Sequence, residues 1–410
     1  MKKINVDIEW QGDQQRVGIL EIFASRGIER YQFTYEREWT RKGFAIDPAL
    51  ELIPSVPYMD NKLWGVFQDI SPDRWGRLVQ SRVNNSHLSE SDFMLGVSDH
   101  MRMGALRLSH AEKPEIYLAD NTDVPKLIHL RELEVAVHRL EAGKETSVDL
   151  AIIAQPGSSL GGAHPKASIE DNGALWLAKF QSNTDTERIS LWEATMLVLA
   201  NKAGICTAHH RILNTNGDRP VLLVKRFDRQ NGQRIPFMSA MTLLERNEST
   251  KDNASYLEIA DAITRYSSQP EIDSREMFTR MTFNAMVGNT DDHLRNHAFL
   301  RQQGGWRLSP AYDINPTPVP SERRNHALSF DGERSKPSLD TCIELAEFFG
   351  LNKKETNLVL GKIAGALTNW KNVARLNGLH GDEISRMECS FEHSNKESLM
   401  QHTQKSSRSE

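Results

Sequence analysis

A predicted helix that stops abruptly in a polar loop is the feature that most constrains this 410-residue sequence. Residues 275–287 carry apolar side chains along a helical run, and such a run can anchor a rigid element in a core. The run ends at Gly288 and Asn289, two residue types that tolerate sharp turns. Residues 288–296 read G-N-T-D-D-H-L-R-N, so two acids, a His, an Arg and an Asn follow a rigid element directly.

Asp291 and Asn296 within this loop are five residues apart. The D-x-x-x-x-N spacing is typical of a catalytic loop for phosphoryl transfer, in which the Asp accepts the proton of the attacking hydroxyl and the Asn holds a magnesium ion. The spacing alone is common, however. A solvated loop in which Asp291 or Asp292 caps a turn is the alternative interpretation.

Composition and charge bound the class of protein. The chain is 39% hydrophobic and 26% charged, with a net charge of −5, which gives no overall signature of nucleic-acid binding. Its length suggests two or three domains. The three cysteines form neither a disulfide framework nor a C-x-x-C pair, and no apolar run approaches the length of a membrane span. We therefore expect a cytoplasmic protein.

Alternating apolar residues predict strands over residues 4–10, 16–24 and 30–35 in the first third of the chain. A helix is expected to start at Pro72 with Ser71 as its N-cap, and another over residues 130–140. At the other end, residues 391–410 are nearly all polar, which predicts a disordered tail.

Residues 155–166 read Q-P-G-S-S-L-G-G-A-H-P-K, and their Gly and Pro content predicts a loop. Glycine lets backbone N–H groups approach phosphate oxygens closely, because no Cβ stands in the way. The stretch is not a Walker A loop, since no Gly-Lys-Ser/Thr follows Gly162. A flexible surface turn is the alternative.

The Asn172-Gly173 turn predicts a hairpin of residues 167–170 and 174–180, with Lys179 near the end of its second strand. Such a lysine is suited to bind the α- and β-phosphates of a nucleotide, although a lysine at a strand end is common. Glu193 lies within an apolar helical run over residues 187–203. It either pairs with Lys179 or is solvated at the edge of the run.

A second hairpin, residues 208–213 and 220–227, ends in charged residues. In a bilobal kinase this exit is the hinge that contacts adenine. Asp313 follows Asn296 by seventeen residues, after strand-like segments at 297–301 and 306–308. It is either a second magnesium ligand or a turn residue before Pro316.

A zinc site is a further alternative, because His293 and His297 have the i, i+4 spacing of a helical metal pair. The glutamate of H-E-x-x-H is missing, since Leu294 follows His293. The turn residues before the loop and the strand-like residues after it also argue against a helix there.

Taken in order, these motifs resemble the HipA family, bacterial kinase toxins of type II toxin–antitoxin modules. The resemblance rests on S-L-G-G-A-H-P-K (159–166), R-F-D-R (226–229), G-N-T-D-D-H-L-R-N-H (288–297) and P-A-Y-D (310–313), with P-D-R-W-G-R (72–77) in the N-terminal part. It extends from near the start of the chain to about residue 380.

The resemblance implies a role for each matching residue. Asp291 would be the catalytic base, Asn296 and Asp313 would hold Mg²⁺, and Ser159 would be the autophosphorylated serine that switches the kinase off, although Ser158 stands beside it. ATP would contact the remaining positions, which are Gly161, Gly162, Ala163, His164, Pro165, Lys166, Lys179, Lys225, Arg226, Phe227, His293, Tyr312 and Asp313.

The fold expected is α+β: a bilobal, protein-kinase-like, HipA-like fold with a β-rich N-terminal subdomain and a mostly helical C-terminal lobe. The segments would be 1–110 (N-terminal subdomain), 111–255 (region with the Gly-rich loop and the ATP lysine), 256–390 (helical lobe) and 391–410 (tail).

The function expected is an ATP- and Mg²⁺-dependent serine/threonine kinase toxin with a role in persistence. Its partners would be a HipB-like helix-turn-helix antitoxin, operator DNA only through that antitoxin, and a protein substrate such as an aminoacyl-tRNA synthetase. The alternatives are a small-molecule phosphotransferase and a catalytically weak co-repressor. His293 follows Asp291, whereas the corresponding His of aminoglycoside-type kinases precedes the Asp, which disfavours the first alternative.

Overall fold

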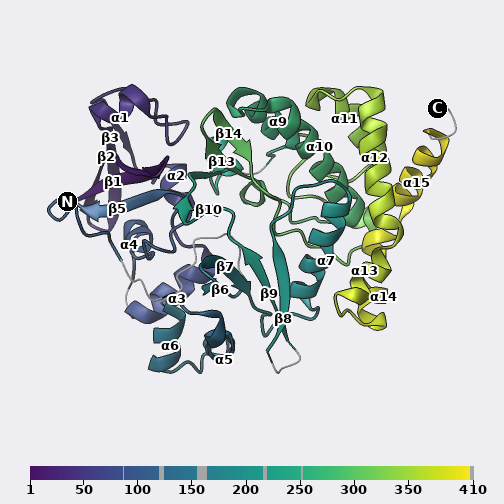
Figure 1. The fold of residues 1–410 in the computed structure, drawn as a ribbon, viewed down its shortest axis with the longest axis horizontal. Helices are drawn as coiled ribbons and strands as arrows, with labels where there is room; N and C mark the ends of the chain where they lie inside the picture. Colours follow the sequence, from purple (N-terminus) through teal and green to yellow (C-terminus); the bar gives the residue numbers. More distant parts are fainter. Residues whose placement is uncertain (86, 120–123, 155–163, 216–218, 251–252, 407–410) are drawn as a thin grey trace. The chain divides into compact units, whose positions relative to one another are not determined.

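The structure is a computed structural model that describes residues 1–85, 87–119, 124–154, 164–215, 219–250 and 253–406. The chain divides into two compact units (Figure 1). The first comprises Met1–Thr184 and Leu223–Asn247, and the second comprises Asp185–Leu222 and Glu248–Glu410.

The first unit begins with an antiparallel sheet of strand order β4-β3-β2-β1-β5. The three strands predicted from alternation are confirmed, because apolar residues of one face are buried, such as Ile4, Val6 and Ile8. The strands are β1 (Lys2–Trp10), β2 (Asp13–Ser25), β3 (Ile28–Tyr35), β4 (Pro57–Asp60) and β5 (Leu106–His110).

Short helices complete this part of the first unit. The predicted start of a helix at Pro72 is wrong: α3 begins at Arg74, and its N-cap is Asp73, whose side chain accepts from the Gly76 backbone N–H. The Ser71 hydroxyl instead donates to the Phe67 carbonyl. The helices are α1 (Arg37–Lys42), α2 (Gly65–Asp69), α3 (Arg74–Asn84), α4 (Glu90–Leu95), α5 (Leu130–Glu141), α6 (Ser147–Ala154) and α8 (Ala240–Leu243).

The predicted Asn-Gly hairpin is formed by β6 (Lys166–Asp171) and β7 (Ala174–Lys179), with φ of 50° at Asn172 and 73° at Gly173. These strands belong to a sheet of order β6-β7-β9-β8. The second predicted hairpin supplies β8 (His210–Asn214) and β9 (Pro220–Lys225). Three short strands follow, which are β10 (Arg229–Gln230), β11 (Gln233–Arg234) and β12 (Phe237–Ser239).

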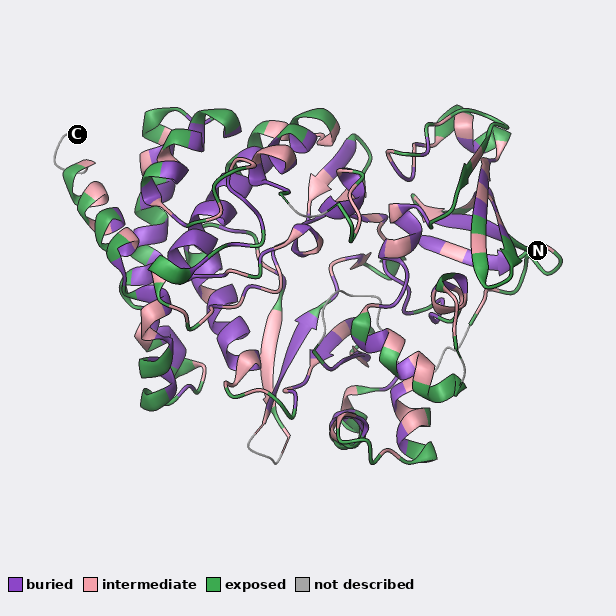
Figure 2. Cartoon of the chain, turned by 180° about the vertical axis from the view of Figure 1, so that it is seen from behind, coloured by how far each residue is buried: buried purple, intermediate pink, exposed green. Residues whose placement is uncertain are grey.

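The second unit is mostly helical and is built around α10, which is buried along most of its length (Figure 2). Two strands, β13 (Ala298–Gln302) and β14 (Gly305–Leu308), form an antiparallel hairpin after the polar loop, as predicted. The helices are α7 (Ile189–Lys202), α9 (Tyr256–Tyr266), α10 (Pro270–Val287), α11 (Leu339–Leu345), α12 (Lys353–Thr368), α13 (Trp370–Leu376), α14 (Gly381–Phe391) and α15 (Ser394–Ser406).

The prediction of a disordered tail from residue 391 is wrong through residue 406. Phe391 is fully buried and stacks on Trp370, with ring centroids 4.0 Å apart. Leu399 is also fully buried and anchors α15, although most of that helix is exposed or only partly buried (Figure 2). This mostly polar stretch thus places two apolar side chains in the core, which a composition-based prediction of disorder does not take into account. No helix among the described residues is long and apolar enough to cross a membrane.

Candidate active site

The end of α10 sets the geometry of the polar loop. Gly288 adopts a left-handed conformation with φ of 66°, and its backbone N–H donates to the Asn284 carbonyl. A Cβ at this position would lie 2.8 Å from Cζ of Arg324. Glycine is therefore required both by its φ angle and by the close approach of the guanidinium. The predicted break of the helix at this residue is confirmed.

Asp291 and Asn296 are brought together by a tight loop. Leu294–Asn296 forms one turn of 3₁₀ helix, and the Asn296 side-chain Nδ2 donates to the Asp291 carbonyl at 3.1 Å. Asp291 is exposed, whereas Asn296 is buried. The bond fixes the amide of Asn296 through its nitrogen, so the oxygen Oδ1 is the atom suited to a hard cation.

Asp292, for which the sequence suggested only a capping role, is the centre of a buried network. Its Oδ2 accepts from Asn284 Nδ2 at 2.8 Å, from His297 Nε2 at 2.9 Å and from the Tyr256 hydroxyl. Burial favours the neutral form of the carboxyl, but the neighbouring His297 and these donors outweigh burial and lower the pKa of Asp292. The side chain is therefore a buried carboxylate at neutral pH.

The P-A-Y-D segment is tied to the same loop. The Tyr312 hydroxyl donates to the Arg295 carbonyl at 2.7 Å. Asp313 has a left-handed φ of 56°, and its backbone N–H donates to Oε1 of Glu193 at 3.1 Å. Glu193 is 2% exposed, so its interpretation as a solvated residue is wrong. Its carboxylate fixes the backbone of Asp313, the predicted metal ligand.

A small cavity in the second unit lies beside the polar loop, and its lining includes neither Asp291 nor Asp313. It is lined by α10, by the polar loop and by the P-A-Y-D segment, through Arg280, Asn284, Asp292, Asn296, His297 and Tyr312 among others. Asn296 and Asp313 offer the oxygen ligands that Mg²⁺ prefers. The zinc alternative conflicts with this geometry, because His293 and His297 are not on one α-helix and His297 Nε2 contacts Asp292.

The first unit holds the other predicted residues. Lys179 is the last residue of β7, and Lys166 lies directly opposite it in β6. Lys166 is therefore a strand residue rather than part of a loop, and its Nζ lies 2.6 Å from Oδ2 of Asp73. Pro165 accepts the Phe180 backbone N–H at 2.9 Å, and His164 is exposed. Ser158, Ser159, Gly161, Gly162 and Ala163 lie outside the described residues.

The R-F-D-R motif has a structural role that the sequence did not reveal. The Arg226 guanidinium is buried against Asp228, with Nη2 2.6 Å from Oδ2, and also donates to the carbonyls of Met101 and Arg102. Its backbone N–H donates to the Leu175 carbonyl, so that group is engaged in the sheet. The contact of Arg226 with ATP that the resemblance implies stays a prediction. Lys225 is exposed and Phe227 is half-buried.

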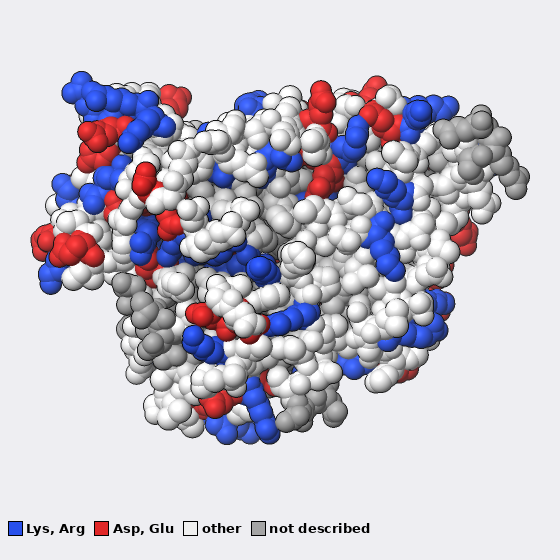
Figure 3. Space-filling model, viewed as in Figure 1, with Lys and Arg blue, Asp and Glu red and all other residues white. Residues whose placement is uncertain are grey.

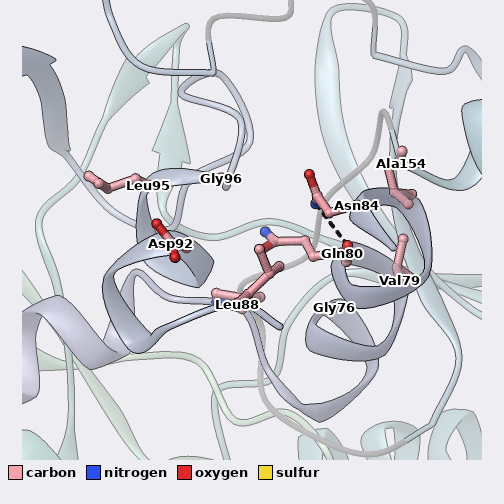
Figure 4. A pocket seen from close by; sticks show the side chains of 11 residues that line it. Gly76, Val79, Gln80, Asn84, Leu88, Asp92, Leu95, Gly96 and Ala154 are labelled. Carbon is pink, nitrogen blue, oxygen red and sulfur yellow. Dashed lines mark hydrogen bonds between the residues drawn. The ribbon is translucent and has the colours of Figure 1, made fainter. Parts of the chain in front are cut away.

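A larger cavity of about 370 Å³ lies in the first unit between α3 and α4 (Figure 4). Val79, Gln80 and Leu88 line it, together with Ala154 at the end of α6. None of the described residues that line it is a predicted site residue. Over the face drawn in Figure 3, groups of basic and acidic side chains are scattered among uncharged residues.

Two domain families match the sequence. The HipA N-terminal domain matches residues 10–109, and the HipA-like C-terminal domain matches residues 158–370. Among curated proteins, "Putative kinase Y4mE" of Sinorhizobium fredii is 27% identical over 150 residues, which is 34% of this chain and 34% of that protein. "Putative kinase" of Haemophilus influenzae is 26% identical over 167 residues, which is 34% of this chain and 48% of that protein. The matched regions thus span about a third and about half of these relatives.

A solved structure has the same fold. The match is to the complex of HipA, HipB and operator DNA from Shewanella oneidensis MR-1, with a TM-score of 0.71 and 17% identity. It covers 98% of this chain and 97% of that one. The predicted α+β, HipA-like fold is therefore confirmed. With both HipA domains matched in the expected order, the chain belongs to the HipA family.

Proposed function

We propose that this chain is an ATP- and Mg²⁺-dependent serine/threonine protein kinase, the toxin of a HipA/HipB-like toxin–antitoxin module. The observation that carries the proposal is the arrangement of the polar loop. Exposed Asp291 follows a rigid helix, and Asn296 is fixed beside it through its amide nitrogen. The curated relatives with kinase names and the family membership support a kinase in general.

Each residue has a distinct chemical role in the proposed reaction. The Asp291 carboxylate accepts the proton of a substrate hydroxyl, whose oxygen bonds to the γ-phosphorus while the bond to the ADP oxygen breaks. Asn296 Oδ1 and the Asp313 carboxylate would hold Mg²⁺, which would neutralise charge on the phosphate oxygens. Lys179 binds the phosphates, and the segment around Lys225 and Phe227 contacts adenine.

The proposed partners follow from the family and from the neighbouring structure. That structure is a complex of HipA with HipB and operator DNA. We propose that a HipB-like helix-turn-helix antitoxin binds this chain, and that operator DNA is contacted only through the antitoxin. The substrate is a protein, with an aminoacyl-tRNA synthetase as one candidate. Phosphorylation of Ser159 adds about −1.5 to −2 charges beside the ATP phosphates and inactivates the kinase.

Incubation of the full chain with ATP and Mg²⁺, followed by mass spectrometry, tests this function. We expect phosphate on Ser159 and turnover that EDTA abolishes. Asp291→Asn should lower kcat about 10²- to 10⁴-fold while ATP affinity, measured by calorimetry, is retained, because the base is lost and the nucleotide contacts remain.

Asp261→Asn is the matched control, since Asp261 is exposed on α9 and has no assigned role in the reaction. A well-folded Asp291→Asn that turns over at the wild-type rate would refute the proposed base. Phosphate found only on Ser158 would correct the residue, and phosphorylation of a small molecule but of no protein would contradict the substrate class.

A further inference from the structure

The polar loop contains two pairs of adjacent residues, Asp291 with Asp292 and Asn296 with His297. Asp291 is exposed and its neighbour Asp292 is buried, whereas Asn296 and His297 are both buried and both line the small cavity. Asp292 and His297 repeat the five-residue spacing of Asp291 and Asn296, displaced by one position. His297 Nε2 and Asp292 Oδ2 are 2.9 Å apart, so these two buried side chains are joined directly.

The Asp292 end of this bond is fixed from three directions. Asn284 on α10 and Tyr256 on α9 also donate to its carboxylate. The backbone carbonyl of Asp292 accepts the Leu328 N–H at 3.1 Å. A buried carboxylate that accepts from three side chains is held more firmly than a neutral acceptor with the same donors would be, because hydrogen bonds to an ionised acceptor are stronger.

The His297 end is fixed mainly by Asp292. The ring of His297 meets the Tyr256 ring edge-on, with centroids 5.9 Å apart. Its Nδ1 has no hydrogen-bond partner among the described residues. Because the carboxylate can only accept, Nε2 carries the proton and donates. Loss of this donor would break the hydrogen bond by which His297, at the end of the loop, is held to Asp292.

We propose that Asp292 and His297 are positioning residues whose hydrogen bond clamps the two ends of the polar loop, so that Asp291 and Asn296 keep the separation that phosphoryl transfer requires. This inference rests on the proposed function. A shift of about 1 Å in a reacting group can slow a reaction about 100-fold. Loss of the hydrogen bond between Asp292 and His297 would let Asp291 and Asn296 change their separation, so we expect it to have a large effect on the rate.

The test compares His297→Phe, which keeps a ring but loses the donor, with His297→Gln, which keeps an N–H donor. We expect His297→Phe to lower kcat about 10- to 100-fold with the KM for ATP changed less than threefold, and His297→Gln to stay within about fivefold of wild type. Adding His297→Phe to Asp291→Asn should cause a smaller loss than His297→Phe causes alone, because the clamp acts partly through Asp291.

A control substitution in the core separates an effect on the position of the loop residues from an effect on the stability of the whole protein. Ile263→Ala removes a buried apolar side chain of α9 that can form no hydrogen bond, so it should lower stability and leave kcat unchanged. A full additional loss of rate in the double variant would overturn the proposal. If His297→Phe does not fold, His297→Gln decides, and a loss of more than tenfold in that variant refutes the clamp.

A second readout does not depend on activity. Hydrogen exchange of the peptide spanning residues 288–297 should be faster in His297→Phe than in wild type and unchanged in His297→Gln. Faster exchange together with an inactive wild-type protein would support the clamp and refute the kinase. An active wild type whose loop exchanges equally in all three proteins would retain the kinase and refute the clamp.

Discussion

The buried ion pair between Asp73 and Lys166 links helix α3 to the first residue of β6, directly after the glycine-rich segment. Their side chains are 5% and 4% exposed, and the charged atoms are 2.6 Å apart. Removal of one member of such a pair costs about 3–5 kcal/mol, because the other charge stays buried without its partner. Asp73→Asn is the sharpest perturbation, since an Asn at this position still caps α3.

Two further features set the expected magnitude. Lys166 lies opposite Lys179 in the β6–β7 register, so loss of the Asp73 carboxylate also leaves two like charges facing each other, which destabilises by about 0.2–1 kcal/mol. Burial raises the pKa of Asp73, although the nearby Lys166 opposes this effect, so an unpaired Asp73 is readily protonated. We therefore expect Asp73→Asn to cost about 4 kcal/mol and Lys166→Met to cost less.

A double-mutant cycle in urea unfolding, followed by circular dichroism, measures this pair. Asp73→Asn combined with Lys166→Met should lie within about 2 kcal/mol of wild type, because a neutral pair of similar volume needs no charge compensation. The coupling energy should then be about 3 kcal/mol. Single variants that each cost less than about 1 kcal/mol, or costs that simply add, would refute the reasoning.

Two more predictions concern residues around the polar loop. Burial lowers the pKa of His326 to about 4, so between pH 6.5 and 4 the unfolded chain binds a proton that the native chain does not. The free energy of unfolding should therefore fall by about 3 kcal/mol as the pH falls through this window. In urea unfolding, His326→Phe should show a weaker dependence of stability on pH than wild type. Gly288→Ala should lower both stability and turnover, because of its φ of 66° and the contact of the new Cβ with Arg324. Gly350→Ala is the control, since its φ is 74° and no atom lies near the new Cβ, and it should show only the backbone cost of about 1 kcal/mol. Equal losses of stability in thermal unfolding would contradict the role of Arg324.

The sequence by itself determined the elements whose signals are local. Alternation predicted β1 to β3, the Asn-Gly turn predicted the β6–β7 hairpin, and the apolar run that breaks at Gly288 predicted α10 and its end. These features depend on residues close together in the chain, so the side-chain period and the backbone preferences of Gly and Asn suffice. The spacing of Asp291 and Asn296 is local for the same reason.

The tertiary structure alone decided where the buried charges find partners. Asp73 pairs with Lys166, which is far from it in the sequence. Glu193 likewise accepts from the distant backbone N–H of Asp313, and Arg226 donates to the distant carbonyls of Met101 and Arg102. Periodicity shows that a polar residue lies in an apolar run, but it does not show which distant group compensates its burial. A buried charge is tolerated only with a partner, and that partner is chosen by the path of the whole chain.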